Sequence, residues 1–245
     1  MTDAPVALIT GANKGLGKET ARQLAQRGMR VLLGSRDPGR GAAAAAELRA
    51  GGATVTPVTL DVTDPGTVEA VAGRLHSDYG RLDVLVNNAG TVLEEPAATL
   101  TAAGMREVFE VNVFGVVTAI HTMLPLLRRS GSPRIVNVSS TTASLTLTSD
   151  GTDFGGDAGR RVAYTSSKAA VNMLTVQYAQ AFAGDPELAH IRIHSATPGY
   201  TATDLTRHRG TRTVTEGARI IVELASSPGS ARSGGFYNDQ GPVPW

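Results

Sequence analysis

The chain has 245 residues, of which 41% are hydrophobic and 18% charged, and its formal net charge is +1. This near-neutral balance gives no electrostatic footprint for nucleic acid or for an anionic membrane surface. Cysteine is absent, which excludes disulfides, cysteine-ligated metals and a thiol nucleophile. The first residues lack the pattern of a signal peptide, and no apolar run has the length of a membrane span. We therefore expect a cytoplasmic protein.

Short apolar runs alternate with helical patterns along the whole chain. The runs predict strands near residues 5–10, 30–35, 54–60, 83–87, 134–139, 190–196 and 235–238. Helical patterns lie near 15–28, 39–50, 65–79, 101–128, 162–183 and 214–226. Strands of mostly continuous Val, Ile and Leu between helices indicate a parallel sheet covered on both faces. The prediction is a Rossmann-type, doubly wound α/β fold with a seven-stranded parallel sheet in a single domain, 1–245.

One segment interrupts this alternation. Residues 141–161 are rich in Thr, Ser, Gly and Asp and show no helical period. A connection of this length inside a compact domain is usually functional or disordered. It lies directly before the helix that carries Tyr164, so we expect a loop beside the functional site.

Glycines follow the first predicted strand, in the run Thr10 to Gly17, with the spacing Gly-x-x-x-Gly-x-Gly. Glycines let the backbone approach a pyrophosphate, and the N-terminus of the following helix offers unpaired N–H groups and a positive dipole. The run therefore predicts a dinucleotide-binding loop. A tight turn that merely needs glycine is the alternative.

The end of the second strand, at Ser35 and Arg36, indicates which dinucleotide binds. NAD-selective folds carry an acidic residue there, which bonds the ribose 2′-hydroxyl. Here the tip has no carboxylate; Asp37 follows Arg36, and Arg40 comes shortly after. A guanidinium matches a phosphate, and Lys14 can add charge from the glycine loop. We therefore predict NADP(H), with solvated loop cations as the alternative.

Tyr164 and Lys168 stand four residues apart on a predicted helix, so they share one face. An unperturbed tyrosine has a pKa of about 10 and is a poor proton donor at neutral pH. A neighbouring ammonium favours the phenolate and lowers that pKa toward the range of a general acid or base. The alternative is a half-buried tyrosine beside a surface lysine.

These motifs together resemble the short-chain dehydrogenase/reductase family, and most of all its carbonyl-reductase branch. The resemblance covers essentially the whole chain. It rests on TGANKGLG at 10–17, Asp61-Val62, NNAG at 87–90, Asn112, VNVSS at 136–140, Tyr164 with Lys168, and PGYTATD at 198–204.

The resemblance implies a catalytic role for four residues. Tyr164 would exchange a proton with the substrate oxygen, and Lys168 would lower its pKa and hold the nicotinamide ribose. Ser140, rather than its neighbour Ser139, would hydrogen-bond the substrate oxygen. Asn112 would hold a water through its backbone carbonyl; a helix kink or a satisfied core amide is the alternative.

The resemblance also implies the cofactor-binding residues. Asp61 and Val62 would meet the adenine, and Asn88, Ala89 and Gly90 would pack beside the adenosine ribose, with Asn87 structural. Pro198, Gly199 and Thr203 would wrap the nicotinamide carboxamide. The phosphate end would consist of Gly11, Asn13, Lys14, Gly15, Leu16, Gly17 and Arg36. Residues 1–139 would mainly bind cofactor, and 140–245 would carry catalysis and substrate binding.

Several features depart from the family pattern. The interval from Ser140 to Tyr164 is longer than usual, as in carbonyl-reductase-like members. The inserted loop, 141–163, favours a monomer or homodimer over the family's usual tetramer, or it covers the substrate pocket. Residues 92–94, the 141–163 loop and residues 200–213 should line that pocket, which we expect to accept bulky apolar carbonyls. His194 is interpreted as part of a polar strand face, and no histidine spacing supports a metal site.

The predicted function is an NADPH-dependent oxidoreductase that transfers hydride between the nicotinamide and a carbonyl or alcohol substrate. Two alternatives stay open: an NADP(H)-binding regulatory protein without catalysis, and an NAD-dependent alcohol dehydrogenase. No nucleic-acid or membrane partner is expected.

Overall fold

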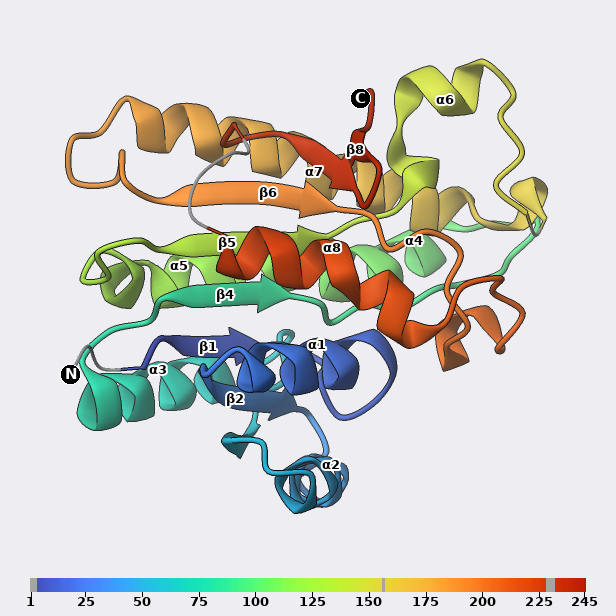
Figure 1. Ribbon diagram of the computed structural model, residues 1–245. Helices are drawn as coiled ribbons and strands as arrows, with labels where there is room; N and C mark the ends of the chain where they lie inside the picture. The colour runs from blue at the N-terminus through green and yellow to red at the C-terminus, as the bar shows by residue number, and fades with distance from the viewer. Residues whose placement is uncertain (1–3, 156, 228–231) are drawn as a thin grey trace.

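The computed structural model describes residues 4–155, 157–227 and 232–245 (Figure 1). The strands are β1 (Val6–Ile9), β2 (Arg30–Ser35), β3 (Val55–Thr59), β4 (Val84–Asn87), β5 (Arg134–Val138), β6 (Arg192–Ala196), β7 (Phe236–Asn238) and β8 (Gly241–Pro242). The α-helices are α1 (Gly15–Gln26), α2 (Pro38–Ala50), α3 (Pro65–Tyr79), α4 (Ala102–Phe109), α5 (Gly115–Leu127), α6 (Leu145–Ser149), α7 (Val162–Ala183) and α8 (Val214–Ser226).

The strands form one sheet in the order β3-β2-β1-β4-β5-β6-β7-β8. β1 to β7 pair in parallel, which confirms the doubly wound fold. The prediction of seven strands was wrong, because β8 adds an antiparallel pair in which Tyr237 lies opposite Pro242. This two-residue strand is too short for a periodic pattern, and its proline is not typical of a strand.

Alternate residues of the sheet are buried under two different helical layers. Val6 and Leu8 of β1 belong to a core shared with α3, α5 and α7. Ala7 and Ile9 belong to the opposite core, shared with α1, α2 and α8. Figure 1 shows α1 and α8 in front of the sheet and α3 and α5 behind it. Because strands buried on both faces need apolar residues throughout, the continuous apolar runs in the sequence identified them.

The helix predicted over 101–128 contains a π-helical turn, η1 (Glu110–Phe114), between α4 and α5. By length and composition alone, Ala102–Leu127 could cross a membrane. However, Ala119, Ile120 and Met123 have no exposed surface and pack with α3 against the sheet. A central core helix therefore explains its apolar composition.

The inserted segment is not the irregular loop that its composition predicts. It contains the 3₁₀ turns η2 (Thr141–Ala143) and η3 (Ala158–Arg160) and the short helix α6. The Ser144 hydroxyl caps α6 by accepting a hydrogen bond from Leu147 N at 3.1 Å. Thr146 N donates to the carbonyl of Trp245 at 2.9 Å, so α6 lies beside the C-terminus (Figure 1). A helix of only five residues is too short to leave a helical period in the sequence.

Candidate active site

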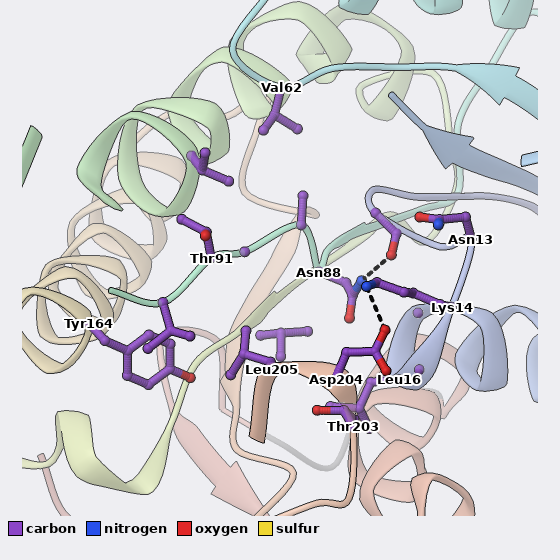
Figure 2. Close-up of a pocket in the computed structure, with 18 of the residues that line it drawn as sticks. Asn13, Lys14, Leu16, Val62, Asn88, Thr91, Tyr164, Thr203, Asp204 and Leu205 are labelled. Atoms are coloured by element: carbon purple, nitrogen blue, oxygen red, sulfur yellow. Dashed lines mark hydrogen bonds and ion pairs between the residues drawn. The ribbon is translucent and has the colours of Figure 1, made fainter. Parts of the chain in front are cut away.

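A cavity of about 640 Å³ lies at the edge of the sheet where the parallel strands end (Figure 2). Every predicted site residue except Asn112 lines it. They are Gly11, Asn13, Lys14, Gly15, Leu16, Gly17, Arg36, Asp61, Val62, Asn88, Ala89, Gly90, Ser140, Tyr164, Lys168, Pro198, Gly199 and Thr203. The strand ends thus bring residues nearly two hundred positions apart to one crevice, at the point where the strand order reverses between β1 and β4.

The glycine loop is packed too closely for side chains. Gly11 has a φ of +61°, and a Cβ there would lie 2.8 Å from the Cα of Ala89. A Cβ on Gly17 would lie 2.5 Å from Asn88 Nδ2. That amide donates to the carbonyls of Thr10 and Gly11, at 2.9 and 3.0 Å, and so ties the loops after β1 and β4 together. Lys14, the N-cap of α1, gives the helix no side-chain hydrogen bond, and this N-terminus suits an anion.

The corner after β2 carries exposed cations. Asp37, the nearest carboxylate, is the N-cap of α2 and accepts a hydrogen bond from Arg40 N at 2.9 Å. Its second oxygen lies 3.5 Å from the Arg40 guanidinium. Arg36 is exposed, and it forms no ion pair with any residue that the structure describes. Asp37 therefore serves the helix, and the guanidiniums face the cavity.

The wall beyond Asp61 and Val62 includes residues that the motifs did not identify. Leu60, Glu107, Val108 and Val111 line the cavity there. Gly115 packs so closely that a Cβ would lie 2.6 Å from Val62 Cγ2. Val108 lies one helical turn before Asn112, and Val111 directly precedes it. This spacing from a predicted site residue is the only sequence signal that could have identified the two valines as cavity residues.

Tyr164 and Lys168 stand on one face of α7, as their spacing predicts. The tyrosine is half-buried, and its hydroxyl points into the cavity in Figure 2. Lys168 is 5% exposed; its ammonium donates to the Val138 carbonyl at 2.7 Å and lies 5.8 Å from the centre of the Tyr164 ring. Both side chains thus project from α7 toward the end of β5.

The two pKa values differ from the expectation that lysine lowers the pKa of tyrosine. Burial raises the pKa of Tyr164 above 10, and a hydrogen bond with Ser140 only partly offsets this. Burial also lowers the pKa of Lys168 from 10.5 to about 8. Desolvation is the largest cause of both pKa shifts, because burial removes water from the charged form of each group. The phenol is therefore protonated at neutral pH.

The two serines after β5 make different contacts. Ser139 is buried, and its hydroxyl donates to the backbone carbonyl of Lys168 at 3.3 Å. The Ser140 hydroxyl lies 3.0 Å from that of Thr142 and hydrogen-bonds Tyr164. Ser139 therefore anchors α7 to the sheet, and Ser140 faces the tyrosine.

Asn112 lies behind the cavity, inside the π-turn, and is 1% exposed. Its side-chain oxygen accepts from Thr91 N at 2.8 Å, and its amide donates to the Thr91 carbonyl and to the Ser167 hydroxyl, both at 2.9 Å. The side chain is thus a satisfied core amide, and these hydrogen bonds do not test the role predicted for the backbone carbonyl. The Asn112 side chain joins the loop after β4 to α7, where its partner Ser167 directly precedes Lys168.

The segment after β6 folds back over the glycine loop. The 3₁₀ turn η4 (Asp204–Thr206) lies near it, so that a Cβ on Gly15 would contact Thr203 at 3.5 Å. Val92 and Leu93 line the cavity as expected, and so do residues 201 and 203–206 of the predicted segment 200–213. The described residues of the 141–163 loop do not line it, so that part of the prediction was wrong. Glu94 does not line the cavity; its carboxylate pairs with Arg207 at 2.8 Å and with Arg209 at 3.3 Å. Sequence spacing could not show this pairing across more than a hundred residues.

Comparison with known proteins defines the class. Residues 5–213 match the family model described as short chain dehydrogenase, and the chain belongs to this family. It is 36% identical over 228 residues to "Short-chain dehydrogenase anuI" of Penicillium roqueforti, covering 91% of this chain and 88% of the relative. It is 30% identical over 277 residues to "Carbonyl reductase [NADPH] 1" of Rattus norvegicus, covering 100% and 99%. A crystal structure of NADPH-bound carbonyl reductase from chicken fatty liver superposes with a TM-score of 0.86 at 27% identity, covering 99% of each chain. The resemblance seen in the sequence is confirmed.

Proposed function

We propose that this oxidoreductase reduces ketones or aldehydes with NADPH, and that Tyr164 is the proton donor. One observation carries the proposal: the Tyr164 hydroxyl, Ser140 and Lys168 lie at one end of a cavity whose other end is the glycine loop and the cationic corner at Arg36. The carbonyl reductases among its relatives, which are named for NADPH, support this choice of reaction and cofactor.

The residues of the phosphate end fit NADPH. A pyrophosphate would lie on the N-terminus of α1, beside the backbone of Gly11 and Gly17, where any Cβ would clash. The 2′-phosphate would lie at Arg36 and Lys14, because Asp37 is engaged as a helix cap. Val62 and Asp61 would border the adenine, and Gly199 and Thr203 the nicotinamide end.

Each catalytic side chain then has a defined task. The bound nicotinamide would supply hydride to the carbonyl carbon. Tyr164, a phenol that is protonated at neutral pH, donates its proton to the carbonyl oxygen. Ser140 hydrogen-bonds the same oxygen while negative charge develops there. Lys168, with a pKa of about 8, is largely charged at pH 7 and stabilises the phenolate that remains on Tyr164.

The test is Tyr164→Phe, with Tyr178→Phe on the same helix as a matched control. Tyr178 packs on Phe182, with ring centres 5.6 Å apart, and does not line the cavity. Loss of the general acid should lower kcat by about 10²–10⁴-fold. The affinity for NADPH, measured by calorimetry, should change less than about twofold, because the cofactor keeps its other contacts. If Tyr164→Phe retained most of the activity, the proposed mechanism would be wrong. If the wild type bound NADPH but reduced no carbonyl, a regulatory role would replace it.

The substrate class, the subunit number and the location of the protein belong to the same proposal. Val92, Leu93 and Leu205 give the catalytic end apolar walls, so we infer bulky apolar carbonyl substrates. A broad carbonyl panel with NADPH tests this, and activity confined to one small polar substrate would refute it. We also propose a cytoplasmic monomer or homodimer, because the inserted segment precedes α7; a tetramer in analytical ultracentrifugation would contradict it.

A further inference from the structure

Lys14, which the proposed function assigns to the 2′-phosphate, already has an anionic partner. Its ammonium lies 2.6 Å from Asp204 Oδ2, across the cavity from the glycine loop to η4 (Figure 2). Both residues line the cavity. The pair joins positions 190 residues apart in the chain, and it connects the loop that starts α1 to the segment that covers it.

The structure holds the Asp204 carboxylate in this position from several sides. Its other oxygen lies 2.8 Å from His208 Nε2. Thr203 and Thr206 form a capping box around η4, with Thr203 N donating to Thr206 Oγ1 at 3.1 Å. Arg207 and His208 adopt positive φ values of 51° and 57°, which side-chain-bearing residues rarely adopt. The backbone therefore turns back tightly enough for His208 to reach the aspartate.

The other cations around the glycine loop differ from Lys14. Lys18, one turn into α1, pairs with Glu47 of α2. Arg40 is 3.5 Å from Asp37, and Arg36 faces the cavity. Lys14 is thus the cation whose partner lies on the segment that closes over the cofactor site.

We propose that Asp204 sets the choice between NADPH and NADH by competing with the 2′-phosphate for Lys14. This inference rests on the proposed function. A lysine ammonium carries a single positive charge, and Asp204 already lies 2.6 Å from that of Lys14. A 2′-phosphate bound to the same ammonium would lie close to the Asp204 carboxylate, and the two anions would repel each other. NADPH must therefore take Lys14 from Asp204, whereas NADH leaves the pair intact. The carboxylate therefore weakens NADPH binding relative to NADH binding.

The experiment measures the dissociation constants of NADPH and NADH by calorimetry for the wild type, Asp204→Asn, Lys14→Ala and the double variant. The ratio of the two constants cancels the general repulsion between Asp204 and the diphosphate, which both cofactors carry. In Asp204→Asn the ratio should shift about threefold toward NADPH, the size expected for one exposed ion pair. In the Lys14→Ala background, Asp204→Asn should leave the ratio unchanged.

Glu47→Gln is the matched control, because it removes the same charge from the partner of Lys18. It should leave the ratio unchanged. The inference would be overturned if Glu47→Gln shifted the ratio of dissociation constants equally, or if Asp204→Asn still shifted it in the Lys14→Ala background. Either result would show that the removed charge acts through the general electrostatic field and not through Lys14. An unchanged ratio in Asp204→Asn would also overturn the inference. If the wild type bound neither cofactor, the proposed function itself would fail, and the two failures are therefore distinguishable.

Discussion

The buried charge of Lys168 should lower the free energy of unfolding of the protein. Lys168 is 5% exposed, and burial lowers its pKa from 10.5 to about 8. At about 1.4 kcal/mol per pKa unit, this difference corresponds to roughly 3 kcal/mol of free energy that the protein loses by burying the charged lysine. Lys168→Met replaces the charge with an apolar chain of similar length. The Val138 carbonyl then loses its hydrogen bond, which costs about 1 kcal/mol. We therefore expect a gain of about 2 kcal/mol in the free energy of unfolding at pH 7.

The gain in the free energy of unfolding of Lys168→Met should depend on pH. In the folded state Lys168 loses its proton near pH 8, and in the unfolded state near pH 10.5. Between these values the unfolded state holds more protons, so the stability of the wild type rises with pH relative to the variant. The advantage of Lys168→Met is complete below pH 8 and should disappear by about pH 10.5.

Urea unfolding followed by circular dichroism at pH 7, 8, 9 and 10 measures this difference. The midpoint should rise at pH 7 with an unchanged m-value. Lys14→Met is the control; Lys14 is 57% exposed, and its substitution should change stability by less than about 0.5 kcal/mol. A variant less stable than the wild type at pH 7, or an equal gap at pH 7 and pH 10, would refute the reasoning.

Three further predictions follow from burial, packing and charge. His194 is buried, so its interpretation as part of a polar strand face was wrong. Burial and two neighbouring arginines lower its pKa to about 4, so the unfolded state binds a proton first as the pH falls. The free energy of unfolding of the wild type should fall by about 2 kcal/mol between pH 7 and pH 5, and that of His194→Gln, measured by urea unfolding, should fall less. In Gly17→Ala the new methyl lies 2.5 Å from Asn88 Nδ2, and this clash should weaken NADPH binding about tenfold or more. Gly73→Ala is the control: its methyl meets nothing within 4 Å, and the variant should stabilise α3 by about 0.5–1 kcal/mol. Arg36→Ala should weaken NADPH about tenfold in calorimetry and leave NADH unchanged; equal losses for both cofactors would contradict its assignment to the 2′-phosphate.

Much of the fold could be predicted because its strands are buried on both faces. β1, β2 and β4 are short, mostly apolar runs, and each is followed at once by a motif that lines the cavity. The same rule explains why Tyr164 and Lys168 could be placed together: four residues on a helix determine a shared face.

The remaining features depend on contacts that no local pattern encodes. β8 exists only because the chain turns back after β7, and α6 is held by its contact with Trp245. The upward shift of the Tyr164 pKa follows from burial, which the sequence spacing of Tyr164 and Lys168 does not reveal. The Lys14–Asp204 pair needs the segment after β6 to fold over the first loop of the chain.

The two sides of the cavity are held by interactions of different strength. On the side of Tyr164 and Lys168, the buried Asn112 side chain makes two hydrogen bonds to Thr91 and one to Ser167, which together tie the loop after β4 to α7. On the covering side, the η4 segment is held by the ion pairs of Lys14 with Asp204 and of Glu94 with Arg207, whose cations are more than half exposed. Exposed pairs contribute at most about 1 kcal/mol each, whereas a buried polar group left without its partner costs about 1–3 kcal/mol. Displacement of the η4 segment therefore costs less free energy than displacement of α7, so cofactor and substrate can enter the cavity while Tyr164 and Lys168 keep their positions.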